Sequence, residues 1–449
     1  MSSETLDGSS IHQELAAVGP VPGLLLIFAQ GVPRLATLAL TKGRIELGRD
    51  FLAEAYDVQD GRISRRHAEV SFDNRTWTVK DLGSRNGTAV DGVQLTASFV
   101  GEPRVIRLGE TLFLPVKDVQ PFITSQPSST ADMAIGPTLR RAWTEIARHA
   151  AAGSVLHMTG ETGSGKELAA RHFHASSARK SGPFVAVNCA AVPSQIAERL
   201  FFGAKRGAYS GAEADAEGYI QAAHGGTLFL DELGELDQSV QAKLLRVLET
   251  HEVLPLGAAR PRTVDFGLVS ATHADLHALV SAGKFRADLY FRLGRPSVRL
   301  PPLRDRREDI PWLIAHALAS AGKLKAHVSL VEAALLRAWP GNVRELLTDV
   351  KVAADAAAAA QADAVRARDL PLGPDSFASD DSGELRDDSS SSVSEGAARD
   401  VSREQIEAAL RTERGNISGA ARALGLHRTQ LRRLLTRYGI DARTFGPQS

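Results

Sequence analysis

The glycine-rich segment Gly160–Lys166 has the residue types and spacing of a loop that holds phosphate groups. In such a loop, backbone N–H groups and the start of the following helix face the anion, and the lysine reaches its outer phosphates. The apolar run at 154–158 and the helical pattern after the lysine supply the strand and the helix that this interpretation requires. The residues predicted to bind ATP here are Gly160, Glu161, Thr162, Gly163, Ser164, Gly165, Lys166 and Glu167.

An acidic pair, Asp231 and Glu232, ends a later apolar run. Glu167 stands where the strict motif has the serine or threonine that binds Mg²⁺, so metal binding must depend on Asp231. Glu232 is the natural base for orienting and activating a water molecule. The loop alone could be an ordinary strand-to-helix turn. Loop and acidic pair together predict an ATP-hydrolysing site with ATP and Mg²⁺ as cofactors.

Three structured regions and two connecting segments are predicted around these residues. Short apolar runs separated by Gly, Asp and Asn turns at 24–118 predict an all-β sandwich. Alternating strand and helix patterns at 133–370 predict an α/β domain with a parallel sheet and, from about residue 305, a helical lid. Residues 119–132 are predicted to be a linker, and the acidic, serine-rich residues 371–399 are predicted to be disordered. The closing residues, 400–445, predict a small all-α domain.

Length, charge and cysteine content limit the class of protein. A chain of 449 residues exceeds the roughly 250–300 residues at which a single hydrophobic core stops growing. Lysine plus arginine and aspartate plus glutamate both number 53, so the net charge indicates no partner. One cysteine excludes a disulfide framework, and no apolar run is long enough to span a bilayer. We expect a soluble, cytoplasmic protein without a membrane partner.

Three polar islands occur in the β-rich region, at 48–49, 64–67 and 81–88, each at a predicted strand end or turn. Loops at one edge of a sandwich can converge on one ligand, and arginine, serine and asparagine side chains suit a phosphate bonded to threonine. The alternative is that the islands are only turns. Their order and spacing resemble those of a forkhead-associated (FHA) domain. The resemblance implies that phosphothreonine is bound, without catalysis, by Arg49, Ser64, Arg65, Arg85 and Asn86.

A helix, a glycine-bearing turn and a second helix are predicted at 416–435. Asn416 or Ser418 can cap the first helix, and apolar residues such as Leu424 and Leu431 pack the pair. The motif resembles the Fis-type helix-turn-helix, which implies binding to enhancer DNA; the alternative is a basic amphipathic helix of another use. The residues expected to face DNA from the second helix are Arg428, Thr429, Gln430, Arg432 and Arg433.

The region 133–368 resembles the AAA+ domains of bacterial enhancer-binding proteins, which activate sigma-54 RNA polymerase. Glutamate after the lysine of the glycine-rich loop is typical of that family. Together with the FHA-like and Fis-like motifs, the resemblance covers almost the whole chain. The segments that carry it in the AAA+ region are 160–167, 183–189, 225–232, 285–293 and 339–346.

The resemblance implies roles for polar residues outside the phosphate loop. Asn188 would hold Glu232 on or off the attacking water and so couple hydrolysis to the bound nucleotide. Arg286 and Arg292 would be arginine fingers, which stabilise transition-state charge on the γ-phosphate bound by a neighbouring subunit. An active site completed by a neighbour requires a homo-oligomeric ring, expected to be a hexamer. Arg344 would contact the nucleotide phosphates from the lid.

One loop occupies the position of the family's Gly-Ala-Phe-Thr-Gly-Ala sequence, which engages sigma-54. Tyr209 keeps the aromatic ring of that sequence, and Ser210 keeps its hydroxyl but lacks the methyl group. Flanking glycines let the tip rise and fall. The residues expected to contact sigma-54 are Gly207, Ala208, Tyr209, Ser210, Gly211 and Ala212.

Three positions depart from the family pattern. His273 replaces a sensor asparagine, although its imidazole can still hydrogen-bond the phosphates of ATP or a water molecule. Leu200 replaces a glutamate, and Gly267 replaces an arginine. We expect these changes to alter how hydrolysis is coupled to the sigma-54 loop.

The sequence predicts a sigma-54-dependent transcription activator, in which ATP hydrolysis by a ring remodels the promoter-bound sigma-54 RNA polymerase holoenzyme. No phosphoacceptor receiver domain is recognised, so control is expected from a Ser/Thr kinase or a phosphothreonine protein. The alternative is a phospho-dependent DNA-binding adaptor or repressor that uses ATP only for assembly. Transcription from a sigma-54 promoter distinguishes the two.

Overall fold

The computed structural model divides the chain into two compact units, residues 1–379 and 380–449, and each is described by itself. Within the described residues, no helix is long and apolar enough to cross a membrane. The residues that the structure describes are 19–40, 43–123, 128–130, 133–153, 155–210, 213–320, 324–371 and 403–412, with the single positions Ala420, Leu424 and Ile440.

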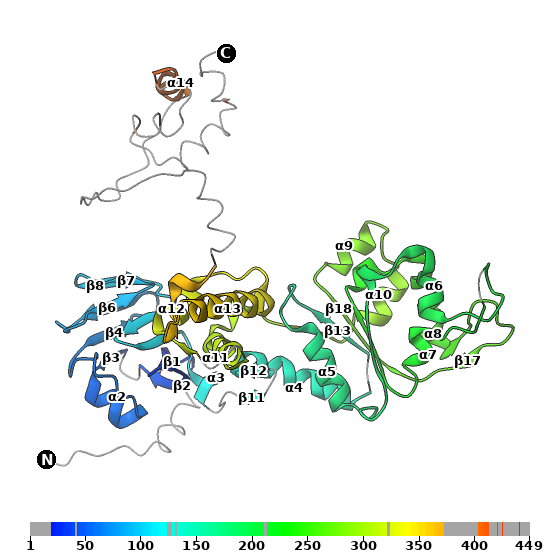
Figure 1. The fold of residues 1–449 in the computed structure, drawn as a ribbon, viewed down its shortest axis with the longest axis horizontal. Coiled ribbons are helices and arrows are strands. Elements are labelled where there is room, and N and C mark those ends of the chain that lie inside the picture. The colour runs from blue at the N-terminus through cyan, green and yellow to red at the C-terminus, as the bar shows by residue number, and fades with distance from the viewer. Residues whose placement is uncertain are drawn as a thin grey trace. The chain divides into compact units, whose positions relative to one another are not determined.

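The first unit begins with a sandwich of two antiparallel sheets, as predicted (Figure 1). The sheets have the orders β2-β1-β10-β9-β6-β7 and β3-β4-β5-β8, and their facing sides enclose apolar residues such as Leu26, Val70 and Phe113. Nothing in the sequence pattern indicates helix α2 (Arg49–Tyr56), which lies between β3 and β4. The strands are β1 (Gly23–Ala29), β2 (Val32–Ala39), β3 (Arg44–Leu47), β4 (Ala68–Phe72), β5 (Trp77–Asp81), β6 (Thr88–Val90), β7 (Val93–Gln94), β8 (Ser98–Gly101), β9 (Ile106–Leu108) and β10 (Thr111–Val116).

A parallel sheet of five strands, in the order β14-β15-β18-β13-β19, forms the α/β domain. Leu228 and Leu230 of β15 pack on one side of the sheet, whereas Phe229 packs on the other. Burial on both faces explains the continuous apolar run before the acidic pair. The strands are β13 (Leu156–Thr159), β14 (Phe184–Asn188), β15 (Thr227–Asp231), β18 (Gly267–Thr272) and β19 (Ser297–Arg299). The helices are α4 (Pro137–Ala151), α5 (Lys166–Ser176), α6 (Ser194–Phe202), α7 (Tyr219–Ala222), α8 (Gln238–Thr250), α9 (Leu276–Ser281) and α10 (Ala287–Leu293).

The lid that follows β19 is helical, as predicted, with one short parallel strand pair in addition. Its main elements are α11 (Ile310–Ser320), β20 (Lys325–Ala326), α12 (Val328–Leu336), α13 (Asn342–Ala359) and β21 (Ala364–Val365). The segment predicted as a linker also contains regular structure in its described residues. Its elements are α3 (Gln120–Ile123) and β11 (Ser128–Thr130), and β11 pairs with β12 (Met133–Ile135).

The sandwich and the lid share one apolar core. Leu24 of β1 and Phe113 of β10 point into the sandwich, whereas Leu25 and Leu114, their neighbours along the chain, pack with the lid. α12 contacts both strands, and Figure 1 shows the lid helices in yellow beside the blue strands. The sandwich contributes Val21, Leu25, Ile27, Phe28, Val105, Leu112, Leu114 and Val119 to this shared core; the lid contributes residues that include Leu313, Ile314, Leu330, Val331 and Leu335.

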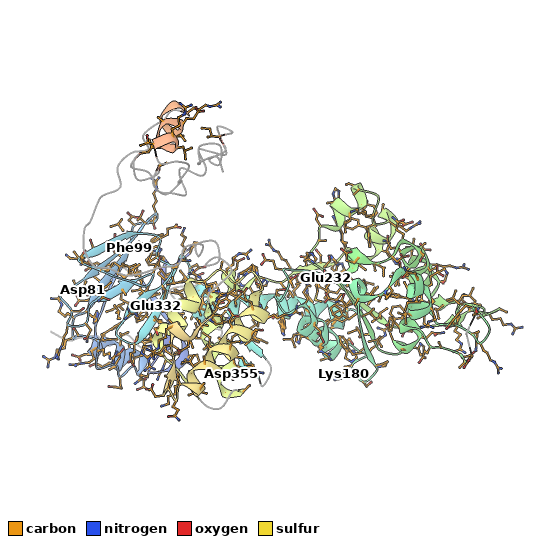
Figure 2. The ribbon with its side chains drawn as sticks, turned by 45° about the horizontal axis from the view of Figure 1, so that its top comes forward. Asp81, Phe99, Lys180, Glu232, Glu332 and Asp355 are labelled. Carbon is orange, nitrogen blue, oxygen red and sulfur yellow. The ribbon has the colours of Figure 1, made fainter. Side chains whose placement is uncertain are left out.

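Polar contacts surround the shared core. The Arg107 guanidinium donates to the Glu332 carboxylate over 2.9 Å, at the side of the lid that faces the sandwich (Figure 2). Arg104 donates to the Leu336 carbonyl over 2.8 Å, and Arg307 of the lid donates to the Arg104 carbonyl over 3.0 Å. The sandwich and the lid therefore pack against each other through an apolar core with polar contacts around it.

The second unit is described at α14 (Arg403–Thr412) and at three single positions. Ile406 and Leu410 of α14 are buried one helical turn apart, which is the spacing of an apolar helix face. The Leu424 N–H donates to the Ala420 carbonyl over 3.1 Å, the hydrogen-bond spacing of a helix. Outside the described residues lie the predicted disordered segment from 372 onward and the predicted DNA-facing residues Arg428, Thr429, Gln430, Arg432 and Arg433.

Candidate nucleotide site and binding loops

The phosphate loop joins β13 to α5, and its glycines are required by its shape. Gly165 precedes the first residue of α5 with φ of 104°, a left-handed conformation that favours glycine. Gly163 has φ of 75°, and a Cβ atom there would lie 2.1 Å from the carbonyl oxygen of Gly341 in the lid. The Lys166 ammonium donates to the Gly160 carbonyl over 3.1 Å. The loop therefore curls tightly beneath the lid with its lysine turned inward.

A cavity of about 400 Å³ lies between this loop, the end of the sheet and the lid. Its dimensions and mixed lining suit a nucleotide, with the base at the apolar end and the phosphates at the polar end. The apolar wall escaped prediction, because its residues follow ordinary helix periodicity in α4, α11 and α13. That wall includes Leu139, Trp143, Leu313, Val343 and Leu347. The predicted residues that line the cavity are Thr162, Gly163, Ser164, Gly165, Lys166, Glu167, Asn188, Asp231, Glu232 and Arg344.

The acidic pair stands at the polar end of the cavity. Asp231 ends β15 in register with Asn188 at the end of β14. Burial raises the pKa of the Asp231 carboxyl, and the nearby Lys166 ammonium opposes part of that rise. Glu232 follows with φ of 52°, in the left-handed region, and its Oε1 atom lies 3.7 Å from Lys166 Nζ. The two carboxylates and the lysine are therefore held within reach of one phosphate chain.

His273, just beyond β18, holds the second oxygen of Glu232. The distance from His273 Nδ1 to Glu232 Oε2 is 2.6 Å. An ionised carboxylate can only accept hydrogen bonds, so Nδ1 carries the proton of this pair. Asn188 instead accepts from the Ala190 N–H over 3.0 Å. Among the described residues, the Glu232 carboxylate thus pairs closely with His273, and no hydrogen bond joins Asn188 to Glu232.

Glu161 ties the phosphate loop to the lid. Its carboxylate accepts two hydrogen bonds from Arg304, over 2.8 and 2.6 Å, and one from the Asn342 amide over 3.1 Å. The Arg304 guanidinium lowers the pKa of Glu161 to about 2. The Val343 N–H donates to the Gly163 carbonyl over 3.1 Å. The phosphate loop and the lid are therefore joined by both side-chain and backbone hydrogen bonds.

The two predicted arginine fingers lie at the ends of α10. Arg286 forms two hydrogen bonds with the Asp288 carboxylate, over 3.0 and 2.8 Å, and Arg292 donates to the Leu248 carbonyl over 3.2 Å. Beside Arg292, the Phe291 side chain is 77% exposed. Neither arginine lines the cavity of its own chain.

The loop predicted to engage sigma-54 is described as far as Ser210; Gly211 and Ala212 lie outside the described residues. Its exposed tip residue, Tyr209, is tied to α6. The Arg199 guanidinium donates to the Tyr209 hydroxyl over 2.6 Å and lies 5.5 Å from the centre of its ring. A phenylalanine at this position would keep the ring contact and lose the hydrogen bond.

The three polar islands of the sandwich meet at one edge. The Arg49 N–H donates to the Ser64 carbonyl over 2.9 Å, and the Ser64 hydroxyl accepts from the Arg85 N–H over 3.0 Å. The Asn86 amide donates to the Arg62 carbonyl over 2.7 Å. The structure therefore brings the islands of Arg49, Ser64, Arg65, Arg85 and Asn86 together through short contacts between loops.

Two buried residues brace these loops. His67 Nδ1 accepts from the Ser64 N–H over 3.0 Å, and its Nε2 lies 3.1 Å from the Gly87 carbonyl oxygen, so Nε2 carries the proton. A Cβ atom on Gly48 would lie 1.9 Å from the Arg65 carbonyl oxygen. Glycine at 48 therefore allows the close approach of the first two islands.

Models of protein families match the chain in four consecutive segments. They are the FHA domain at 45–112, the sigma-54 interaction domain at 134–299, the AAA+ ATPase lid domain at 304–384 and the bacterial regulatory protein, Fis family, at 397–438. All four match the order predicted from the motifs.

Curated relatives and one solved structure agree with these matches. The response regulator protein PilR of Pseudomonas aeruginosa is 37% identical over 349 residues, which cover 75% of this chain and 76% of PilR. The Nif-specific regulatory protein of Herbaspirillum seropedicae is 44% identical over 218 residues, which cover 47% of this chain and 40% of that protein. GlrR of Escherichia coli is 37% identical over 301 residues, which cover 65% of this chain and 64% of GlrR. The structure of NtrX from Brucella abortus superposes with a TM-score of 0.51 and 29% identity, covering 69% of this chain and 70% of NtrX.

These matches define a class of bacterial transcription regulator built around a sigma-54 interaction domain. The chain belongs to the family of sigma-54-dependent transcriptional regulators, and its central domain is an AAA+ ATPase domain with its lid. Within that family, it carries an FHA domain before the AAA+ domain and a Fis-type helix-turn-helix after it.

Proposed function

We propose that this protein activates transcription by coupling ATP hydrolysis to the remodelling of promoter-bound sigma-54 RNA polymerase. The observation that carries the proposal is the cavity of about 400 Å³ whose polar end combines Lys166, Asp231 and Glu232. The domain that contains it also presents Tyr209 on an exposed loop. Membership of the sigma-54 family supports the choice of partner.

In the proposed reaction, the apolar wall holds the base and Lys166 binds the outer phosphates. Within the described residues, no group of three or more His, Cys, Asp or Glu side chains could hold a metal ion. Mg²⁺ at such sites binds through one or two carboxylates together with the phosphates of its nucleotide. Asp231 is the carboxylate that would hold the ion, which would supply positive charge beside the phosphates. Glu232 orients a water molecule and accepts its proton, while the water oxygen bonds to the γ-phosphorus and the bond from that phosphorus to ADP breaks, which releases ADP and phosphate.

The proposed active site is completed by a second copy of the chain in a ring, expected to be a hexamer. Arg286, just before α10, and Arg292 on α10 are exposed, as is the ring of Phe291, and this exposure supports a contact with a neighbour. A guanidinium brought to the γ-phosphate by that neighbour stabilises the charge of the transition state. The C-terminal Fis-type domain would hold the ring at enhancer DNA.

Open-complex formation on a sigma-54 promoter tests this function. Wild-type protein with ATP is expected to open promoter DNA bound by the sigma-54 holoenzyme, as measured by permanganate reactivity of the unpaired thymines. A non-hydrolysable ATP analogue is expected to support assembly but not opening. Full regulatory activity with the analogue would favour the adaptor or repressor that uses ATP only for assembly.

Replacing Tyr209 with phenylalanine is expected to strengthen sigma-54 binding about fivefold. The substitution removes the hydrogen bond from Arg199, which is worth about 1 kcal/mol in favour of the tethered loop. Binding is measured by fluorescence anisotropy of labelled sigma-54 in the presence of a transition-state analogue of ATP. Arg199→Ala also removes the contact with the ring, so it should strengthen binding at least as much, and the double variant should bind as Arg199→Ala does. The matched control, Tyr219→Phe on α7, should bind as the wild type does; an unchanged affinity in Tyr209→Phe would rule out the tether.

We also propose that the FHA domain binds phosphothreonine at the edge where its three polar islands meet. This proposal is supported by the Ser64 hydroxyl, the Asn86 amide and the exposed guanidinium groups of Arg65 and Arg85, which lie on loops joined by short hydrogen bonds. These are the donors that phosphate recognition uses. A Ser/Thr kinase or its substrate is the partner that this chemistry fits.

Arg49→Ala is expected to weaken binding of phosphothreonine peptides at least about tenfold, because a charge-assisted hydrogen bond contributes about 1.5–3 kcal/mol. The full-length protein is titrated with a degenerate phosphothreonine peptide library and with the same peptides unphosphorylated. Arg44→Ala removes an exposed arginine of β3 that pairs with Glu69, so it serves as the matched control. Equal affinity of Arg49→Ala and wild type would contradict the assignment.

A further inference from the structure

A buried cluster of charged residues lies where the lid begins. Arg306 is 3% exposed, and Asp309 and Glu308 are 1% and 5% exposed. Burial lowers the pKa of the Arg306 guanidinium and raises the pKa of both carboxyl groups. Charged groups removed from water are stable only where their partners are well placed. None of the roles that the family resemblance implies involves a residue of this cluster.

The cluster connects three segments that are distant in the sequence. Arg306 Nη2 donates to the Ser164 carbonyl of the phosphate loop over 2.7 Å. Its Nη1 atom lies 3.6 Å from Asp309 Oδ2. Asp309 Oδ1 in turn accepts from the Gly136 N–H, immediately before α4, over 2.7 Å. The phosphate loop, the start of α4 and the start of the lid are thus linked through two buried side chains.

The same three segments carry the walls of the nucleotide cavity. Arg306 itself lines the cavity beside Ser164. α4 carries Leu139 and Trp143 of the apolar wall, and α11, which begins directly after Asp309, carries Leu313. Displacement of any one segment would therefore change the distance between the phosphate subsite and the base subsite.

Two observations distinguish this joint, the buried connection that Arg306 and Asp309 make between the phosphate loop, the start of α4 and the start of the lid. A Cβ atom on Gly136 would lie 2.2 Å from Asp309 Oδ1 and 3.0 Å from Glu308 Cγ, so only glycine allows the observed approach. The Ser164 hydroxyl and Arg306 Nε are buried at the cavity without a hydrogen-bond partner in the described part of the chain. Such groups are rare unless a ligand or a structural need keeps them.

We propose that Arg306 and Asp309 are positioning residues that hold the phosphate loop, α4 and the lid at the spacing in which the cavity accepts ATP. Arg306 acts through the Ser164 carbonyl and Asp309 acts through the Gly136 N–H. The proposal rests on ATP binding in this cavity. It predicts that damage to the joint weakens nucleotide binding while the reacting groups at Glu232 stay in place.

Gly136→Ala provides the first test, because Gly136 does not line the cavity and its Cβ atom would push against Asp309. The dissociation constant of a fluorescent ATP analogue is expected to rise at least about tenfold, with kcat at saturating ATP within about threefold of wild type. Arg306→Met is expected to have the same or a larger effect. Arg306→Lys keeps the charge but lacks the planar fork that reaches two acceptors, so it should restore part of the affinity.

Arg307→Met is the matched control, since Arg307 is the next residue and donates to the Arg104 carbonyl of the FHA domain. It should bind ATP as the wild type does. Thermal unfolding of each variant shows which ones are folded at the assay temperature. If Arg306→Met is unfolded, Gly136→Ala and Arg306→Lys decide the question. Wild-type affinity in both, or a loss of kcat without a loss of affinity, would overturn the proposal. A wild-type protein that binds ATP but does not hydrolyse it would overturn only the proposed function.

Discussion

Replacing Glu232 with glutamine is expected to lower kcat for ATP hydrolysis by about 10²–10⁴-fold and to leave ATP affinity nearly unchanged. The amide has the shape of the carboxylate but cannot accept the proton of the attacking water. Lys166, which binds the phosphates in the proposed reaction, and Asp231, which would hold Mg²⁺, are untouched. Phosphate release measures turnover, and a fluorescent ATP analogue measures affinity.

Glu235→Gln is the control for this prediction. Glu235 is exposed and lies in the short 3-10 helix that follows Glu232, Leu233–Glu235. Its replacement makes the same chemical change three residues away and should leave turnover unchanged. Normal turnover in Glu232→Gln would mean that another group activates the water.

Replacing Arg292 with alanine is expected to lower kcat by about 10³-fold or more, the effect of removing an arginine finger. ATP affinity should change little, because Arg292 does not line the cavity of its own chain. An equal mixture of Arg292→Ala and Glu232→Gln subunits should regain activity. Some interfaces of a mixed ring combine an intact Glu232 from one subunit with an intact Arg292 from its neighbour.

The mixing experiment separates a shared active site from a self-contained one. Arg246→Ala removes an exposed arginine of α8 and should behave as wild type, alone and in mixtures. The mixture of Arg292→Ala and Glu232→Gln subunits could assemble into rings and still be inactive. That result would show that Arg292 does not act between subunits.

The phosphate loop and the acidic pair could be predicted because their chemistry is local. Gly163 and Gly165 adopt backbone conformations that favour glycine, and Asp231 and Glu232 directly follow the strand that positions them. The role of Arg306 could not be predicted in the same way. Its sequence neighbours suggest a surface charge, and only tertiary packing shows that it is buried against Ser164.

The apolar pattern of strand β1 contains information about packing that the prediction of a strand did not use. The run Leu24–Phe28 predicts a strand, but it is continuously apolar, whereas a sandwich strand with one face in water alternates. Continuity indicates that both faces of β1 are covered. Which elements cover the outer face could not be predicted, because α11 and α12 lie far along the chain and their apolar faces fit many partners. The pairing of His273 with Glu232 could not be predicted for a similar reason, because β15 and β18 become neighbours only in the folded sheet.

The shared core of sandwich and lid limits how this architecture can be exchanged by recombination. A domain joined to its protein only by a linker can be replaced by a single crossover within that linker. Here Leu25 and Leu114 of the sandwich and Val331 of the lid complete one another, although the entire α/β domain separates them in the sequence. A crossover between sandwich and α/β domain would therefore leave two apolar faces in water, on the lid and on the departing domain. Transfer of this FHA domain to another protein would thus require a matching lid, which is encoded by a distant segment of the same gene.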